Sequence, residues 1–115
     1  MRDSLLKIRI SHEGNTALGP GKIELLLMIE QHGSISAAAK QMQMSYRRAW
    51  ALVDVMNRCF DQVVVLSSTG GTHGGGAQVT EFGKSLIGAY QQILKKSAEA
   101  AADELDLITR HLKKA

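Results

Sequence analysis

The stretch SISAAAKQMQMSYRRAW, residues 34–50, has the pattern of two short helices joined by a tight turn. Ser34 or Ser36 can cap the first helix, and the alanines that follow favour helix and are small enough for two helices to cross closely. Two methionines supply apolar side chains at the turn, and Ser45 can cap the second helix. The stretch therefore predicts a helix-turn-helix.

The first turn of the second helix carries side chains that can reach the edges of DNA bases. Arginine binds guanine with two hydrogen bonds or grips a phosphate. Trp50 lies one residue off the expected buried face, so it either belongs to the core or gives its indole N–H to a phosphate. Two ordinary helices with a polar surface are the alternative. The residues expected to contact DNA on the two helices are Ser36, Ser45, Tyr46, Arg47, Arg48 and Trp50.

The flanking segments predict further regular elements. Apolar and polar residues alternate in LLKIRIS, residues 5–11, which predicts a strand with one wet face. Pro20 suits the first position of a helix and Gly33 the residue just past its end. Apolar residues at spacings of three and four extend the second helix of the central stretch. Its buried face is expected to consist of Ala49, Val53, Met56 and Phe60.

The glycine-rich stretch SSTGGTHGGGAQ, residues 67–78, is interpreted as the tip of a β-hairpin. A β-branched strand precedes it, and AQVT, residues 77–80, can return as the partner strand. A phosphate-binding loop before the GKS at 83–85 would need glycine where Gln78 stands, so that motif fails. Glycines let a backbone pass close to a sugar-phosphate chain; a loop without contacts is the alternative. The tip residues expected to touch DNA are Ser68, Thr69, Thr72, His73, Gly74 and Gly75.

A long helix is expected from Thr80 to about Lys113. About 33 residues at ~1.5 Å each would span about 50 Å, more than a small core covers. Its apolar stripe continues to the end, and a second copy of the chain is the economical cover for it. The residues expected at this dimer interface are Leu86, Tyr90, Ile93, Leu94, Leu105, Ile108 and Leu112.

Composition limits the possible classes of protein. The 115 residues suit a single domain, divided into a helix-turn-helix with hairpin, 1–79, and a long helix, 80–115. The single Cys59 excludes an internal disulfide, and no apolar run is long enough to span a bilayer, so a cytoplasmic protein is expected. The four histidines lack metal-ligand spacing and no catalytic arrangement is legible, so neither a metal site nor an enzyme is expected.

Two stretches, GSISAAAKQMQMSYRRAWALVDVMN at 33–57 and TGGTHGGGAQVTEFGKSLI at 69–87, resemble the N-terminal domain of the ModE regulators, whose helix-turn-helix is similar to that of LysR-type regulators. The resemblance runs from about Gly21 to Leu94. It implies a winged helix-turn-helix that binds DNA and dimerises partly through its C-terminal helix. It assigns the recognition helix to Ser45, Tyr46, Arg47, Arg48 and Trp50, and the wing to 69–76.

In full-length members of that family an oxyanion-binding region follows the DNA-binding domain, so we expect no molybdate site and no cofactor within this chain. The leading hypothesis is a mainly α, winged helix-turn-helix regulator that binds double-stranded DNA as a homodimer on a near-palindromic operator. The alternative is a protein-protein interaction module on the same scaffold without DNA binding. A nucleotide-binding enzyme rests on the glycine loop alone.

Overall fold

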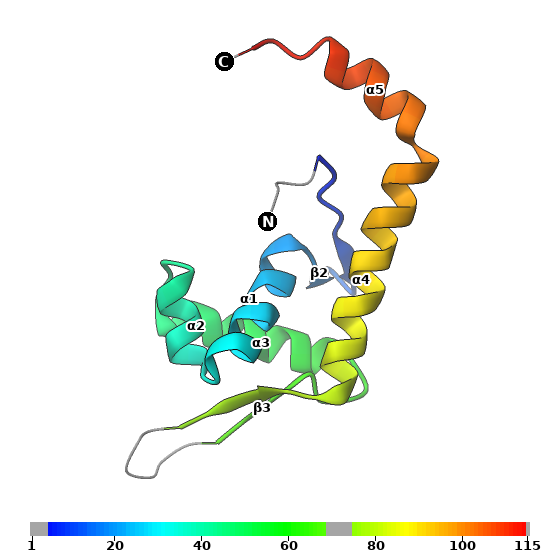
Figure 1. Cartoon of the computed structure of the whole chain (residues 1–115). Coiled ribbons are helices and arrows are strands. Elements are labelled where there is room, and N and C mark those ends of the chain that lie inside the picture. Colours follow the sequence, from blue (N-terminus) through cyan, green and yellow to red (C-terminus); the bar gives the residue numbers. More distant parts are fainter. Residues whose placement is uncertain (1–4, 69–74, 115) are drawn as a thin grey trace.

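Two helices joined by a tight turn, followed by a β-hairpin, form the body of the molecule (Figure 1). The structure is a computed structural model that describes residues 5–68 and 75–114. It is mainly helical, as predicted, and it has two small antiparallel hairpins where the sequence predicted one. The elements are β1 (Ile10–His12), β2 (Asn15–Leu18), α1 (Pro20–His32), α2 (Ile35–Gln41), α3 (Tyr46–Cys59), β3 (Val65–Ser67), β4 (Ala77–Val79), α4 (Glu81–Ala100) and α5 (Ala102–Arg110).

The helix ends follow the local signals of the sequence. Pro20 opens α1, and Gly33 ends it in the left-handed region with φ 77°. Of the two serines that could cap α2, Ser34 does so: its Oγ accepts from the N–H of Ala37 at 3.0 Å. Ser45 caps α3 by accepting from the N–H of Arg48 at 3.1 Å. The central stretch is thus a helix-turn-helix, as predicted.

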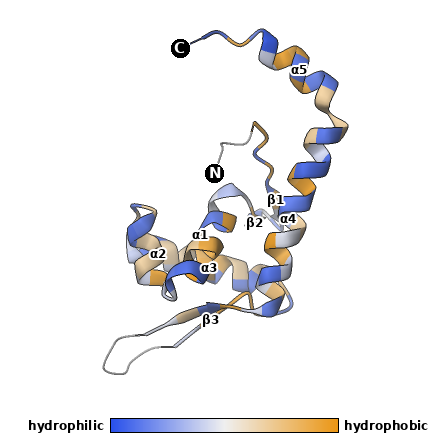
Figure 2. Cartoon of the chain, viewed as in Figure 1, coloured by the Kyte–Doolittle hydropathy of each residue, from blue (hydrophilic) through white to orange (hydrophobic). Residues whose placement is uncertain are grey.

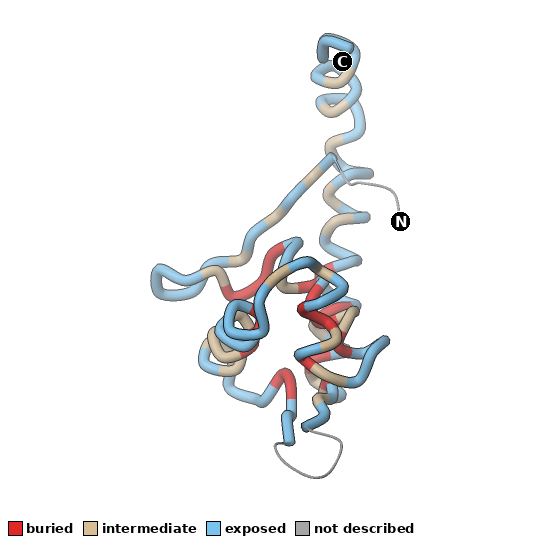
Figure 3. The backbone as a smooth tube through the Cα atoms, turned by 90° about the vertical axis from the view of Figure 1, so that its left-hand side faces the viewer, coloured by how far each residue is buried: buried red, intermediate tan, exposed pale blue. Residues whose placement is uncertain are grey.

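The core lies where α1, α2, α3 and α4 meet. Ala38, Ala39 and Ala49 are buried there, and their small side chains let α2 and α3 cross closely. The predicted buried face is confirmed for Ala49, Val53 and Met56. The fourth predicted residue, Phe60, follows the end of α3 and lies half-buried against Phe82. In Figure 3 the buried segments gather in the body, while the far part of the C-terminal helices is exposed. The largest fully buried side chains are Tyr90, Leu25, Leu26, Ile29, Met56, Val64 and Val79.

The N-terminal strand prediction was only partly right. The burial of residues 5–10 alternates with period two, but the ladder starts later, at Ile10. The sequence reading missed β2, which pairs antiparallel with β1 and ends at Leu18, opposite Ile10. Glu13 and Gly14, with φ 47° and 83°, form the turn between the two strands. Strand β1 begins at Ile10 because its partner β2 ends at Leu18, so residues 5–9 have no strand residues opposite them.

The prediction of one helix from Thr80 to Lys113 was wrong. Thr80 does cap α4, with its Oγ1 2.9 Å from the N–H of Gly83, but the helix ends at Ala100. Ala101 has φ −102° and ψ 21°, outside helical geometry, and α5 then leaves in a new direction (Figure 1). None of the described residues of α5 is buried, so no packing holds the two helices straight. The acidic pair 103–104 favours a new helix start.

Apolar and polar residues are interspersed along α4 and α5 as far as the C-terminal end of α5 (Figure 2). None of the helices within the described ranges is both long and apolar enough to cross a membrane.

The first turn of α4 packs so closely on the hairpin that only glycine fits. A Cβ at Gly83 would lie 2.6 Å from the carbonyl oxygen of Val64 and 2.7 Å from Cγ1 of Val79. We predict that Gly83→Ala lowers the free energy of unfolding by about 1–3 kcal/mol through overpacking.

Gly88→Ala, on the same helix, is the matched control, because a Cβ at Gly88 meets nothing within 4 Å. It should raise stability by up to about 1 kcal/mol through helix propensity. Urea unfolding of both variants checks this. If Gly83→Ala were as stable as Gly88→Ala, the close approach would be refuted.

Candidate nucleic-acid interface

The N-terminal half of α3 presents its polar and aromatic side chains to solvent. Arg47 and Arg48 are exposed, Tyr46 and Trp50 have relative exposures of 53% and 47%, and Ala49 between them is fully buried. Trp50 is therefore a surface residue rather than a core residue. The buried alanine fixes which face of the helix turns outward.

A groove of about 250 Å³ lies between α3, the start of α2 and the hairpin of β3 and β4. It brings together three segments that the sequence analysis selected separately. Hydroxyls, an indole, a phenol and hairpin backbone surround it, and these groups suit the hydrogen-bonding and stacking contacts that proteins make with sugars, phosphates and bases. Its lining residues are Ser34, Ile35, Ser36, Tyr46, Trp50, Ser67, Ser68, Gly75 and Gly76.

The positive charge beside this groove is not neutralised within the described ranges. No carboxylate there lies within ion-pair distance of Arg47 or Arg48. Further along the same helix, by contrast, Arg58 pairs with Asp54 at 3.0 Å. The first turn of α3 therefore offers two cations to an anionic partner, and its last turn does not.

Two of the serines predicted to contact DNA are exposed and also accept hydrogen bonds from the backbone. The Oγ of Ser45 accepts the capping bond from Arg48, and the Oγ of Ser68 accepts from the N–H of Gly76 at 3.3 Å. Ser36 is exposed and lines the groove, and so does Gly75. The four remaining wing predictions lie outside the described residues; they are Thr69, Thr72, His73 and Gly74.

The sequence analysis missed Asn57, which joins α3 to the hairpin. Its Nδ2 donates to the carbonyl of Val65 at 3.1 Å. Its Oδ1 accepts from the N–H groups of Val64 at 2.8 Å and Val65 at 3.2 Å. No local signal marks this residue, because an asparagine in a helix is ordinary and its partners lie seven and eight residues away.

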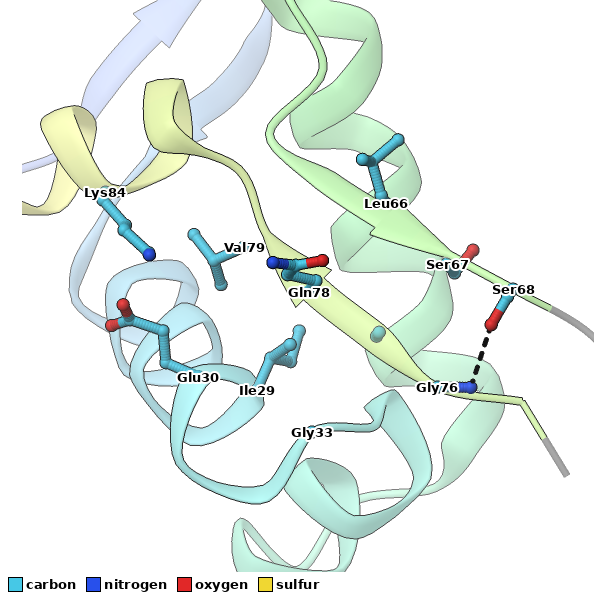
Figure 4. A pocket seen from close by; sticks show the side chains of 11 residues that line it. Ile29, Glu30, Gly33, Leu66, Ser67, Ser68, Gly76, Gln78, Val79 and Lys84 are labelled. Atoms are coloured by element: carbon cyan, nitrogen blue, oxygen red, sulfur yellow. Dashed lines mark hydrogen bonds between the residues drawn. The ribbon is translucent and has the colours of Figure 1, made fainter. Parts of the chain in front are cut away.

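A second groove, of about 600 Å³, lies between the hairpin and the C-terminal end of α1. Figure 4 shows Glu30, Ile29, Gln78 and Lys84 around it, with Leu66 on the neighbouring strand. The ammonium of Lys84 is 3.3 Å from a carboxylate oxygen of Glu81. Among its described lining residues one cation, Lys84, stands beside one carboxylate, Glu30, so this groove offers an anion no net positive charge.

The residues expected at a dimer interface divide into two groups. Tyr90 belongs to the core of its own chain: it is 2% exposed and its hydroxyl donates to the carbonyl of Ile8. It is therefore removed from the expected interface, because a partner cannot reach it. Leu86 and Leu94 pack half-buried against the same core. The other expected residues are half-buried or exposed; they are Ile93 on α4, Leu105 and Ile108 on α5, and Leu112 just beyond α5. Leu107 on α5, which was not among the expected residues, is exposed as well.

No group of three or more metal-ligating side chains gathers in residues 5–68 and 75–114. Partial burial lowers the pKa of Lys22 at the start of α1; Cys59 opposes this change and Arg9 reinforces it. Lys22 does not line either groove.

The exposure of Trp50 predicts a spectroscopic signal, because it is the only tryptophan. If nucleic acid covers the first groove, titration with duplex DNA should change the intrinsic fluorescence intensity and protect the indole from acrylamide quenching. Binding without any change in Trp50 accessibility would show that DNA occupies another face. The control moves the only tryptophan to a site outside the groove. Val63 suits this purpose, because it is exposed to the same 47% and does not line the groove, so the control variant carries Trp50→Phe and Val63→Trp.

Comparison with curated proteins gives a consistent group of relatives. The chain is 36% identical to the "Molybdenum transport protein ModE" of Azotobacter vinelandii over 101 residues, which cover 88% of this chain and 37% of that protein. It is 39% identical to the "DNA-binding transcriptional dual regulator ModE" of Escherichia coli K12 over 88 residues, 74% of this chain and 34% of that protein.

A third relative, the "Molybdenum-pterin-binding protein MopA" of Rhodobacter capsulatus, is 37% identical over 83 residues, 72% of this chain and 31% of that protein. The chain thus spans about a third of the length of the curated relatives it matches. No protein-family model matches it. The names of these relatives describe regulation, transport and binding.

Proposed function

We propose that this chain, which belongs to the ModE-type family in the segment it shares with these relatives, is a sequence-specific DNA-binding transcriptional regulator that acts as a dimer. The observation that carries the proposal is the single face on which α3, the start of α2 and the β3–β4 hairpin meet. In this reading α3 is the recognition helix and the hairpin is the wing.

The chemistry of the recognition helix supports entry into the major groove of DNA. Arg47 and Arg48 are exposed and unpaired within the described ranges, and arginine recognises guanine through O6 and N7. Tyr46 offers a hydroxyl to a phosphate or an aromatic edge to a thymine methyl. Trp50 and Ser36 line the groove, and we propose that they hydrogen-bond the phosphate backbone between recognition helix and wing.

The dimer is proposed from the apolar residues that are left uncovered on α4, on α5 and just beyond α5. Ile93, Leu107, Ile108 and Leu112 are exposed at 38%, 53%, 58% and 61%. A two-fold pairing of these helices would bury them in both copies. It would also set two recognition helices in register with half-sites about one helical turn of DNA apart, or a multiple of that.

The proposal includes no molybdate site. The names of the relatives suggest that the regulated genes concern molybdenum, and mapping of bound sites across the source genome tests that link. Sites next to genes for molybdate transport or molybdenum enzymes are the expected result, and a random distribution of sites is the result against it.

Truncation of one arginine should weaken binding to the mapped site. We predict that Arg47→Ala costs about 1–3 kcal/mol, or about 5- to 150-fold in Kd, if it reads a base. Arg58→Ala is the matched control: it removes the same charge from the same helix, where Asp54 already neutralises it. Fluorescence anisotropy with labelled duplex at several salt concentrations measures both.

An equal, small loss in the two arginine variants would indicate nonspecific attraction only. Absence of binding by the unmodified chain to any duplex at low salt would refute the proposed function.

The dimer proposal predicts a change of mass rather than of fold. Ile108→Glu places a charge in the proposed interface and should shift the light-scattering mass from two chains toward one. Leu66→Glu is the control, because Leu66 on β3 is similarly exposed, at 56% against 58%. If both variants and the unmodified chain had the mass of one chain at micromolar concentration, the dimer would be excluded.

A further inference from the structure

Asn57 pairs with the hairpin in the manner of a neighbouring strand. The N–H and C=O of Val65 both engage its side-chain amide, at 3.2 and 3.1 Å. In an antiparallel pair, the N–H and C=O of one residue point to the same side. Val65 therefore turns both groups away from β4 and toward α3. The amide of Asn57 satisfies this outer edge of β3, and a third bond from Val64 fixes it further.

The other edge of the hairpin is held independently. The N–H of Ala77 on β4 donates to the carbonyl of Gly33 at 2.8 Å. Gly33 is the residue that ends α1 and precedes the cap of α2. The two strands are thus tied to two different elements: β3 to the last turn of α3, and β4 to the junction of α1 and α2.

These ties set the angle between helix and hairpin. Asn57 lies 11 positions beyond Tyr46, about 16 Å along the helix axis at 1.5 Å per residue. The hairpin starts at that far end of α3 and extends back until Ser67 and Gly76 line the same groove as Trp50. A small rotation at the anchor would therefore widen or close the groove at its other end.

We propose that Asn57 is a positioning residue for DNA binding: its amide holds the β3–β4 hairpin at the angle to α3 that lets recognition helix and wing engage one duplex together. The inference rests on the proposed function. Hydrogen bonds suit this role because they are directional. Asn57 itself need not touch DNA.

The test is a double-mutant cycle between Asn57 and the hairpin tip. Asn57→Leu keeps the branched shape of the side chain and removes all three hydrogen bonds. The tip is removed by replacing residues 69–75 with Asn-Gly, a two-residue turn that suits the bonded pair Ser68 and Gly76. If Asn57 acts through the wing, Asn57→Leu should weaken binding about tenfold in the full chain and less than about twofold in the tip-deleted chain.

Two further variants keep the cycle interpretable. Asn57→Asp retains the acceptor for the N–H groups of Val64 and Val65 but loses the donor to the carbonyl of Val65. An intermediate loss of affinity is therefore expected. This variant also takes the place of Asn57→Leu if Asn57→Leu does not fold. Tyr90→Phe removes a different hydrogen bond, far from the hairpin, and controls for lowered stability. It should lower the melting temperature and leave Kd unchanged.

A measurement without DNA separates this inference from the proposed function. Residual dipolar couplings of the free protein should report a changed orientation of β3–β4 relative to α3 in Asn57→Leu and not in Tyr90→Phe. An unchanged orientation, or equal losses of affinity with and without the tip, would overturn the positioning role while DNA binding stands. Absence of specific binding by the unmodified chain would instead refute the proposed function, and with it the positioning role of Asn57.

Discussion

The backbone of Val64 is the point on which the arrangement of the molecule depends. Its N–H donates to Asn57 of α3, and its carbonyl accepts from the backbone N–H of Thr80 at 3.0 Å. The first turn of α4 then approaches that carbonyl so closely that only Gly83 fits. One buried residue thus joins the second helix of the helix-turn-helix, the hairpin and the C-terminal helix.

This junction explains how a chain with few aromatic residues and a net charge of only +3 presents a defined candidate interface. The net charge says little about this face, because its two arginines are consecutive residues in the first turn of α3. Arg47 and Arg48 are exposed at one end of α3, whereas Arg58, Lys84 and Arg110 have carboxylate partners elsewhere. Local placement of a few unpaired cations, rather than bulk charge, gives the candidate interface its character.

The elements predicted correctly from sequence are those governed by local rules. Serine and threonine caps, a proline start, a glycine end and the apolar spacing of α3 each act within one helical turn, so Ser34, Ser45 and Thr80 are legible without a structure. The exposure of Trp50 was open, because a residue beside the buried face of a helix can turn either way. The buried Ala49 next to it decides that question only once the packing of α2 is known.

The sequence predictions are wrong where contacts between distant segments determine the position of a residue. Tyr90 fits the apolar stripe of α4, but the carbonyl of Ile8, 82 positions earlier, takes it into the core. The long helix breaks at Ala101 because the residues beyond it do not pack on the core. Helix propensity is a local quantity and does not include this loss of packing. Asn57 was missed because its role depends on the position of a strand edge. Sequence patterns therefore identify exposed residues well. They identify less well the residues, such as Asn57 and Tyr90, that join distant segments.

Hydroxyl-radical footprinting of the unmodified chain on its mapped genomic site tests the central claim most directly. The account predicts two protected patches related by two-fold symmetry. Their centres should lie about one helical turn of DNA apart or a multiple of that, each with adjoining backbone protection from the wing. A single unpaired patch, or protection without any adjoining backbone contact, would contradict a dimer that binds through recognition helix and wing together.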